Sequence, residues 1–130
     1  MDPIADMIIR LKNAVLAGRD TVVLPYSELK RAIAEKLRAR GFVKDIVIRG
    51  KKAAQKTLEI TLSRNPSGTF RFSDVKRMSR PGRRLYVGAR DIRAVQGGMG
   101  SVLVSTPKGV LFGDEARKEY VGGEVLFEIW

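Results

Sequence analysis

The chain is arranged around the stretch Val104-Ser105-Thr106-Pro107-Lys108-Gly109-Val110, which follows an apolar strand and turns through two hydroxyls and a proline. A second compact turn, Gly122-Gly123-Glu124, opens the last strand of the chain. Turns that carry hydroxyls and glycines on a small basic domain favour a surface that contacts nucleic acid. The turns alone do not establish that function, so the rest of the sequence has to support it.

The charge balance favours a polyanionic partner. The 130 residues include 25 Lys and Arg against 14 Asp and Glu, a formal net charge of +11. Each cation set against a phosphate releases condensed counterions, so such an excess favours nucleic acid, with an anionic membrane as the competing partner. No run of about 18 apolar residues exists, and Asp2, Asp6 and Arg10 interrupt any signal-peptide segment. We therefore expect a cytoplasmic protein with no membrane partner.

Cysteine and histidine are both absent from the chain. Their absence removes disulfides, thiolate chemistry, the commonest general base and the commonest metal ligand. Catalysis would have to use carboxylates, lysine, tyrosine or hydroxyls. We therefore expect no enzyme activity, no cofactor, no metal site and no small-molecule substrate.

The first half of the chain predicts the order α-β-α-β-β. Asp2 and Pro3 are typical of a helix start, and Gly18 is typical of its end. Ser27 is expected to cap a second helix that ends before Gly41. Alternation of apolar and polar residues predicts strands at 21–24, 43–49 and 57–62.

A basic sector is expected on the second helix. Lys30, Arg31 and Arg38 fall within a sector of roughly 100° at the helical period. Such a sector is usually a solvated face. On a chain of this net charge, a phosphate-binding surface is an equally good interpretation.

Residues 64–69 have the composition of a linker. We therefore predict an N-terminal α/β module at 1–63, a short linker at 64–69 and a β-rich RNA-binding module at 70–130. In the second module we expect strands near 83–87, 101–104 and 124–130, with a short helix at 114–119. The predicted fold class is α+β, with two small modules, the second mainly antiparallel β.

Arg84 and Tyr86 point the same way from the predicted strand at 83–87. A basic and an aromatic side chain side by side suit phosphate contact and base stacking, although a half-buried strand tyrosine is the commoner role. Before this strand, Pro81 and Gly82 predict a turn in which Gly82 takes a positive φ. The glycine-rich stretch 96–100 lacks the spacing of a phosphate-binding loop and is interpreted as close backbone packing.

Several motifs, in order along the whole chain, resemble those of one family, the bacterial small-subunit ribosomal proteins numbered eight. The motifs are Asp2-Pro3-Ile4-Ala5-Asp6-Met7, Arg10-Leu11-Lys12-Asn13-Ala14, Gly41-Phe42, Ser79-Arg80-Pro81-Gly82-Arg83-Arg84-Leu85-Tyr86-Val87, Ser105-Thr106-Pro107-Lys108-Gly109-Val110-Leu111, Glu115-Ala116-Arg117-Lys118, Val121-Gly122-Gly123-Glu124 and Trp130. The resemblance implies two small α/β modules and a non-catalytic structural protein of the cytoplasmic ribosome. It also implies binding to a distorted stem in the central domain of 16S ribosomal RNA, mostly through the minor groove, early in assembly.

The resemblance further implies which residues contact RNA and which partners exist. Its main contacts carry over to the two turns, namely Ser105, Thr106, Pro107, Lys108 and Gly109, with Gly122, Gly123 and Glu124. Small hydroxyl and glycine turns suit a wide, shallow groove in which 2′-hydroxyls and base edges are exposed. We expect Arg84, Lys108, Lys30 and Arg31 to hold phosphates, Ser105, Thr106 and Glu124 to discriminate, and Tyr86 to stack or bond to a sugar. Implied partners are neighbouring small-subunit proteins and, for a translational repressor, a messenger RNA that mimics the ribosomal site.

Two positions depart from the family pattern. Pro107 stands where the family usually has serine, and it has neither a side-chain donor nor a backbone N–H. Phe112 and Gly113 stand where the family usually has a capping threonine and an aspartate, at a typical cost of about 1 kcal/mol. Two other classes stay open at this point, an RNA-modifying enzyme and a DNA-binding regulator on a similar scaffold.

Overall fold

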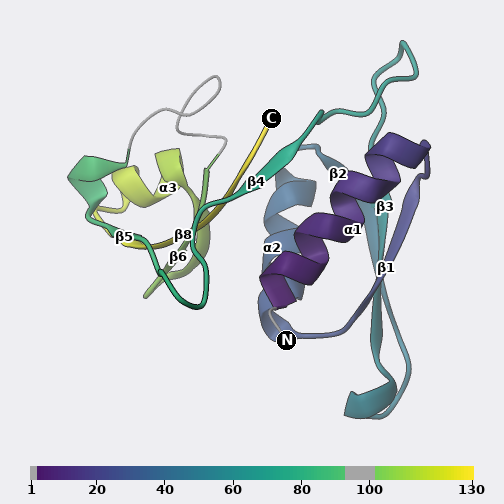
Figure 1. Cartoon of the computed structure of the whole chain (residues 1–130), viewed down its shortest axis with the longest axis horizontal. Coiled ribbons are helices and arrows are strands. Elements are labelled where there is room, and N and C mark those ends of the chain that lie inside the picture. Colours follow the sequence, from purple (N-terminus) through teal and green to yellow (C-terminus); the bar gives the residue numbers. More distant parts are fainter. Residues whose placement is uncertain (1–2, 93–101) are drawn as a thin grey trace. The chain divides into compact units, whose positions relative to one another are not determined.

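A computed structural model describes residues 3–92 and 102–130 of the chain (Figure 1). It divides into two compact units, Pro3–Ser73 and Asp74–Trp130. Each unit combines helix with antiparallel sheet, so the predicted α+β fold is confirmed. The segment predicted as a linker, 64–69, lies within the first unit, and separate folding of 1–63 and 70–130 stays a prediction.

The first unit has the predicted order α-β-α-β-β. Its described residues form a three-stranded antiparallel sheet in the order β1-β3-β2, and Figure 1 shows both helices on one side of it. The larger elements are α1 (Pro3–Ala17), β1 (Thr21–Pro25), α2 (Glu28–Ala39), β2 (Val43–Arg49) and β3 (Thr57–Leu62), with the 3-10 turn η1 (Ala53–Gln55) between β2 and β3.

Local sequence signals explain where these elements begin and end. Ser27 is extended and its side chain accepts a hydrogen bond from the N–H of Lys30 at 3.1 Å, which caps α2 as predicted. Gly41 follows the helix at φ 84°, a left-handed conformation that favours glycine. In β3, Leu58, Ile60 and Leu62 are buried and alternate with partly exposed residues, because only one face of this sheet is covered. The predicted cap at Asp2 lies outside the described residues.

Arg64 attaches the segment after β3 to the first unit. Its guanidinium donates to Asp20 Oδ1 at 2.6 Å, to the carbonyl oxygen of Gly68 at 2.6 Å and to that of Gly18 at 3.1 Å. The same group lies 4.1 Å from the ring centroid of Phe70. One side chain therefore links the end of α1, the start of β1 and the 64–70 segment.

The second unit has its last strand at the centre of the sheet. Among the described residues, the sheet runs β4-β8-β6-β7, and β5 also pairs with β8. Residues 125–129 of β8 are all buried, which confirms the prediction of a central last strand. The elements are β4 (Val75–Arg77), β5 (Tyr86–Val87), η2 (Ala89–Asp91), β6 (Val102–Thr106), β7 (Gly109–Phe112), α3 (Gly113–Lys118) and β8 (Gly123–Ile129).

Two elements differ from the predicted ones. The predicted strand 83–87 is shorter, because Arg83 closes a tight turn with Arg80 and only Tyr86–Val87 pairs with β8. The short helix α3 begins at Gly113, after Phe112, whose ring is buried in the core. The N–H of Phe112 donates to Glu115 Oε1 at 2.9 Å, so a carboxylate within the helix satisfies the donor at its start.

Candidate nucleic-acid interface

The turn between β6 and β7 is closed by the hydroxyl of Thr106. Thr106 pairs with Gly109 across the hairpin, which leaves Pro107 and Lys108 as the exposed turn residues. Thr106 Oγ1 donates to the carbonyl oxygen of Gly109 at 2.7 Å and accepts from the N–H of Lys108 at 3.1 Å. This hydroxyl therefore has a structural role, beside the discriminating role predicted from the sequence.

The two glycines before Glu124 permit close backbone packing. A Cβ atom on Gly123 would lie 1.9 Å from the carbonyl oxygen of Ser105, and one on Gly122 would lie 2.1 Å from that of Val87. Both contacts are far inside van der Waals distance. Any side chain at these positions would push β8 away from its neighbours. Contact of the two glycines with RNA stays a prediction.

Three of the predicted site residues form one row across the sheet. Glu124 of β8 pairs with Tyr86 of β5 on one side and with Ser105 of β6 on the other. Directly opposed residues in an antiparallel sheet project from the same face. Close packing at Gly122 and Gly123 thus brings the two predicted turns together. We call Tyr86, Glu124 and Ser105 the recognition row.

The recognition row presents unused groups at its two ends. Tyr86 is 64% exposed, so the alternative of a half-buried strand tyrosine is wrong. The Ser105 hydroxyl is partly exposed and makes no hydrogen bond to another described residue. A stacking ring and a free hydroxyl on one face suit contact with RNA bases and sugars.

Glu124, in the middle of the row, is held by two side chains. Its Oε2 accepts from Ser79 Oγ at 2.5 Å and from Arg84 Nη1 at 3.1 Å. Ser79 is 3% exposed, and its hydroxyl also accepts from the N–H of Leu85 at 3.0 Å. The carboxylate is therefore fixed in place before any ligand arrives. Sequence reasoning missed Ser79, since a serine at the start of a turn gives no sign of its long-range partner.

Lys108 is available to an incoming phosphate. Its Nζ lies 2.9 Å from Glu119 Oε2, and both side chains are about half exposed. Exposed ion pairs of this kind contribute only about 0–1 kcal/mol. A phosphate could therefore replace Glu119 as the partner at little cost.

The predicted exposed basic sector on α2 is wrong for Lys30. This residue is only 4% exposed, because it precedes Ile33, Ala34 and Leu37 at the spacing of the buried helix face. Burial lowers the pKa of Lys30 from its ordinary value; Asp6 opposes this effect and Arg10 adds to it. Arg31 is exposed as predicted. Contact of either residue with phosphate stays a prediction.

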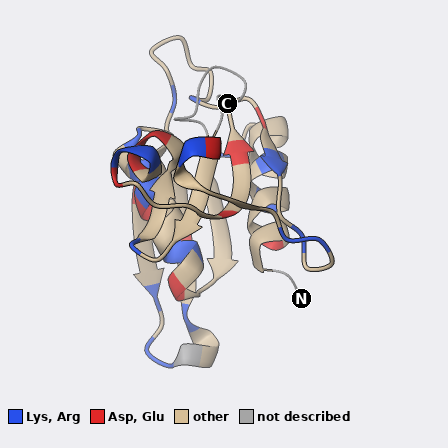
Figure 2. Ribbon diagram, turned by 90° about the vertical axis from the view of Figure 1, so that its left-hand side faces the viewer, with Lys and Arg blue, Asp and Glu red and all other residues tan. Residues whose placement is uncertain are grey.

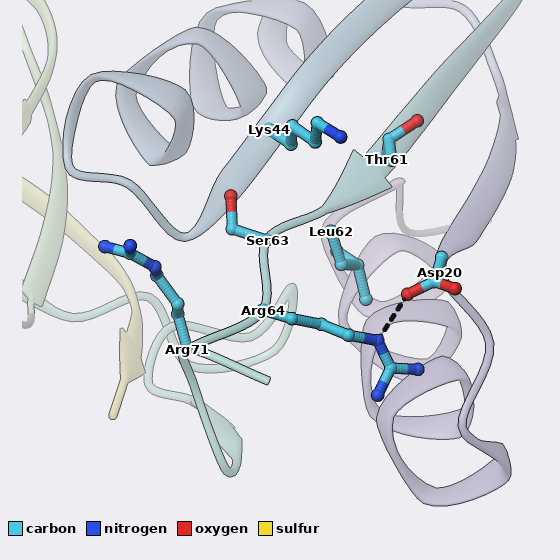
Figure 3. A pocket seen from close by; sticks show the side chains of 7 residues that line it. All are labelled: Asp20, Lys44, Thr61, Leu62, Ser63, Arg64 and Arg71. Carbon is cyan, nitrogen blue, oxygen red and sulfur yellow. Dashed lines mark hydrogen bonds and ion pairs between the residues drawn. The ribbon is translucent and has the colours of Figure 1, made fainter. Parts of the chain in front are cut away.

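A pocket of 610 Å³ in the first unit contains none of the predicted site residues. Figure 3 shows Arg64 turned toward Asp20 in this pocket, while Arg71 extends away from that pair. Asp20 and Arg64 thus neutralise each other. Its lining is Asp20, Lys44, Thr61, Leu62, Ser63, Arg64 and Arg71. We assign this pocket no catalytic role.

Metal-binding and membrane-spanning features are not found in the part of the chain that the structure describes. No group of three or more acidic side chains within 3–92 and 102–130 could hold a metal ion. No helix in the same ranges is long and apolar enough to cross a bilayer. Figure 2 shows basic residues on helices, strands and loops of the chain, as expected from the net charge of +11.

Comparison with known proteins gives one consistent result. The family model described as Ribosomal protein S8 matches residues 2–130. The chain is 43% identical over 129 residues to the small ribosomal subunit protein uS8 of Chloroflexus aurantiacus, covering 99% of this chain and 97% of that protein. It is 44% identical over 125 residues to the uS8 protein of Rubrobacter xylanophilus, covering 96% and 94% of the two chains. It is 42% identical over 132 residues to that of Caldicellulosiruptor bescii, covering 100% and 98%.

Proposed function

This chain belongs to the ribosomal protein S8 family, and on that premise we propose that it binds a distorted stem in the central domain of 16S ribosomal RNA and supports subunit assembly. Membership makes it a small-subunit ribosomal protein of the cytoplasmic ribosome. It is a structural protein and not an enzyme, so the alternative of an RNA-modifying enzyme is wrong. Neighbouring small-subunit proteins are its further proposed partners.

The recognition row is the observation that carries the proposed RNA contact. Ser105 and Tyr86 offer a hydroxyl and an aromatic ring on one face of β5, β8 and β6, with the fixed carboxylate of Glu124 between them. In the minor groove of RNA, a carboxylate can accept from a guanine amino group or a 2′-hydroxyl, and a serine can donate or accept. Lys108 and Arg84 border the row and supply positive charge for phosphates.

A single hydroxyl deletion tests this assignment. Ser105→Ala removes a group that has no described partner in the protein, so it should leave the fold unchanged. We expect the Kd for a transcript of the 16S central domain to rise about fivefold, the worth of one hydrogen bond of about 1 kcal/mol, with no change for a random duplex. Fluorescence anisotropy at fixed salt measures both.

Ser73→Ala is the matched control, because Ser73 is exposed and lies outside the recognition row. It should leave both Kd values unchanged. Equal losses on the central-domain transcript and on the random duplex for Ser105→Ala would contradict a recognition role. Nuclease footprinting of 16S RNA with the native chain should show protection confined to one stem of the central domain.

Two related roles stay proposals. If the chain also represses translation, an mRNA segment should compete with the central-domain transcript for the same row. If it were instead a DNA-binding regulator, duplex DNA would compete as well as stem-loop RNA at the same salt concentration. The 2′-hydroxyl contacts expected of Ser105 favour RNA.

A further inference from the structure

A groove beside the recognition row is lined almost entirely by cations. It has a volume of 380 Å³ and lies within the second unit. Five of its seven lining residues are basic and none is acidic: they are Lys76, Arg77, Met78, Arg80, Arg83, Arg84 and Leu85. We call this surface the basic groove. A concentration of positive charge of this kind is unfavourable in the free protein and becomes favourable when an anion binds.

A tight turn places two of these arginines directly opposite each other. The N–H of Arg80 donates to the carbonyl of Arg83 at 3.1 Å, and the N–H of Arg83 donates to that of Arg80 at 2.9 Å. Gly82 does not take the positive φ predicted for it, since the unprimed type I turn that Pro81 also suits does not need one. Opposed residues of such a pair lie on one face, and like charges there repel each other. An anion between the two guanidinium groups would remove that repulsion.

Three cations of the groove are not engaged by the protein. Arg84 is bonded to Glu124, and Arg77 donates to the carbonyl oxygen of Ser79. Lys76, Arg80 and Arg83 are exposed, and their side chains make no hydrogen bond or ion pair with any residue in the described ranges. These three side chains are therefore available for an external anion.

We infer that the basic groove binds the phosphodiester backbone of the RNA strand that contacts the recognition row. The inference rests on the proposed function and adds to it a second set of contacts, which position the RNA without reading its sequence. Arg84 lines the groove and is bonded to Glu124 of the row, so the two surfaces are continuous. Guanidinium groups bind phosphate oxygens in pairs, and the groove carries four of them.

The salt dependence of RNA binding tests this inference. Each phosphate contact contributes roughly 0.7–0.9 to the slope of log Kd against log salt concentration. The triple variant K76A/R80A/R83A should therefore lower the slope by about two to three. At about 0.1 M salt, its Kd for the 16S central-domain transcript should rise on the order of 100-fold or more. The matched control K44A/K51A/K52A removes the same charge from exposed lysines of the first unit and should change the slope by less than about half a unit.

A charge-retaining variant separates loss of charge from loss of structure. K76R/R80K/R83K keeps three cations in the groove and should keep the slope of the native chain. Circular dichroism on heating should give the same unfolding transition for all variants, because the changed side chains are exposed. A slope lost in both groove variants would overturn the inference, since charge would not then be the cause.

Other outcomes distinguish this inference from the proposed function. If the native chain binds the transcript with a steep slope and K76A/R80A/R83A does the same, the groove inference fails and the proposed function stands. If the native chain shows no preference for the transcript, the proposed function fails. Inorganic phosphate at millimolar concentration should compete only weakly. Cosedimentation with phosphatidylserine vesicles that depends on these three cations, with an unchanged RNA slope, would assign the groove to a membrane and overturn the inference.

Discussion

Replacing Gly123 with alanine tests whether the glycine turn before Glu124 serves packing or only RNA contact. A Cβ at this position would lie 1.9 Å from the carbonyl oxygen of Ser105 and 2.8 Å from its carbonyl carbon. Ordinary contact begins at 3.4 Å, so β8 and β6 would have to separate by about 1.5 Å. Both neighbouring atoms belong to the backbone, which cannot move aside as a flexible side chain can.

The cost can be estimated from the contacts that this separation disrupts. Forcing an extra methyl into a well-packed site costs typically about 1–3 kcal/mol. Loss of the two nearest ladder hydrogen bonds would add about 1 kcal/mol each. We therefore expect Gly123→Ala to lower the free energy of unfolding of the second unit by about 3 kcal/mol or more.

Urea unfolding followed by the fluorescence of Trp130 measures this quantity. Trp130 is the only tryptophan of the chain, and its backbone forms two hydrogen bonds of 3.1 Å with Asp74 at the first residue of the second unit. Gly82→Ala is the matched control, because no atom lies within 4 Å of its added Cβ and its φ is not positive. The control should stay within about 0.5 kcal/mol of the native chain. Equal stability of the two variants would refute the packing argument.

Two other substitutions separate structural roles from predicted binding roles. Thr106→Val removes both hydrogen bonds of the turn hydroxyl and should lower the free energy of unfolding by about 1–2 kcal/mol, whereas Thr106→Ser should keep it; equal losses would point to the methyl group instead. For Lys30, burial lowers the pKa below its ordinary value of 10.5, so the unfolded chain binds this proton more tightly and native stability rises with pH from the folded pKa up to 10.5. The stability of Lys30→Met relative to the native chain should therefore fall over that pH window in urea titrations. A relative stability that rises there would contradict the burial argument, and exposed Arg31→Met should show no such trend.

Short-range patterns predicted most of the secondary structure. The bounds expected for β2 and β3 from their alternation are those of the structure, and Ser27 caps α2 as expected. These features depend on residues within a few positions of one another, so a single segment contains the whole signal. The strand at 83–87 was predicted too long, because the Arg80–Arg83 turn takes up its first residues.

The sequence by itself determined the fold class, the family motifs and a strongly basic charge, because each depends on local order or on simple counting. Only the tertiary structure decided which residues meet. The row of Tyr86, Glu124 and Ser105 depends on strand register between segments far apart in the chain. The bond from Ser79 to Glu124 and the burial of Lys30 depend on which face each element turns toward its neighbours. Register and facing are set by packing across the sheets, and no short segment of the sequence encodes them alone.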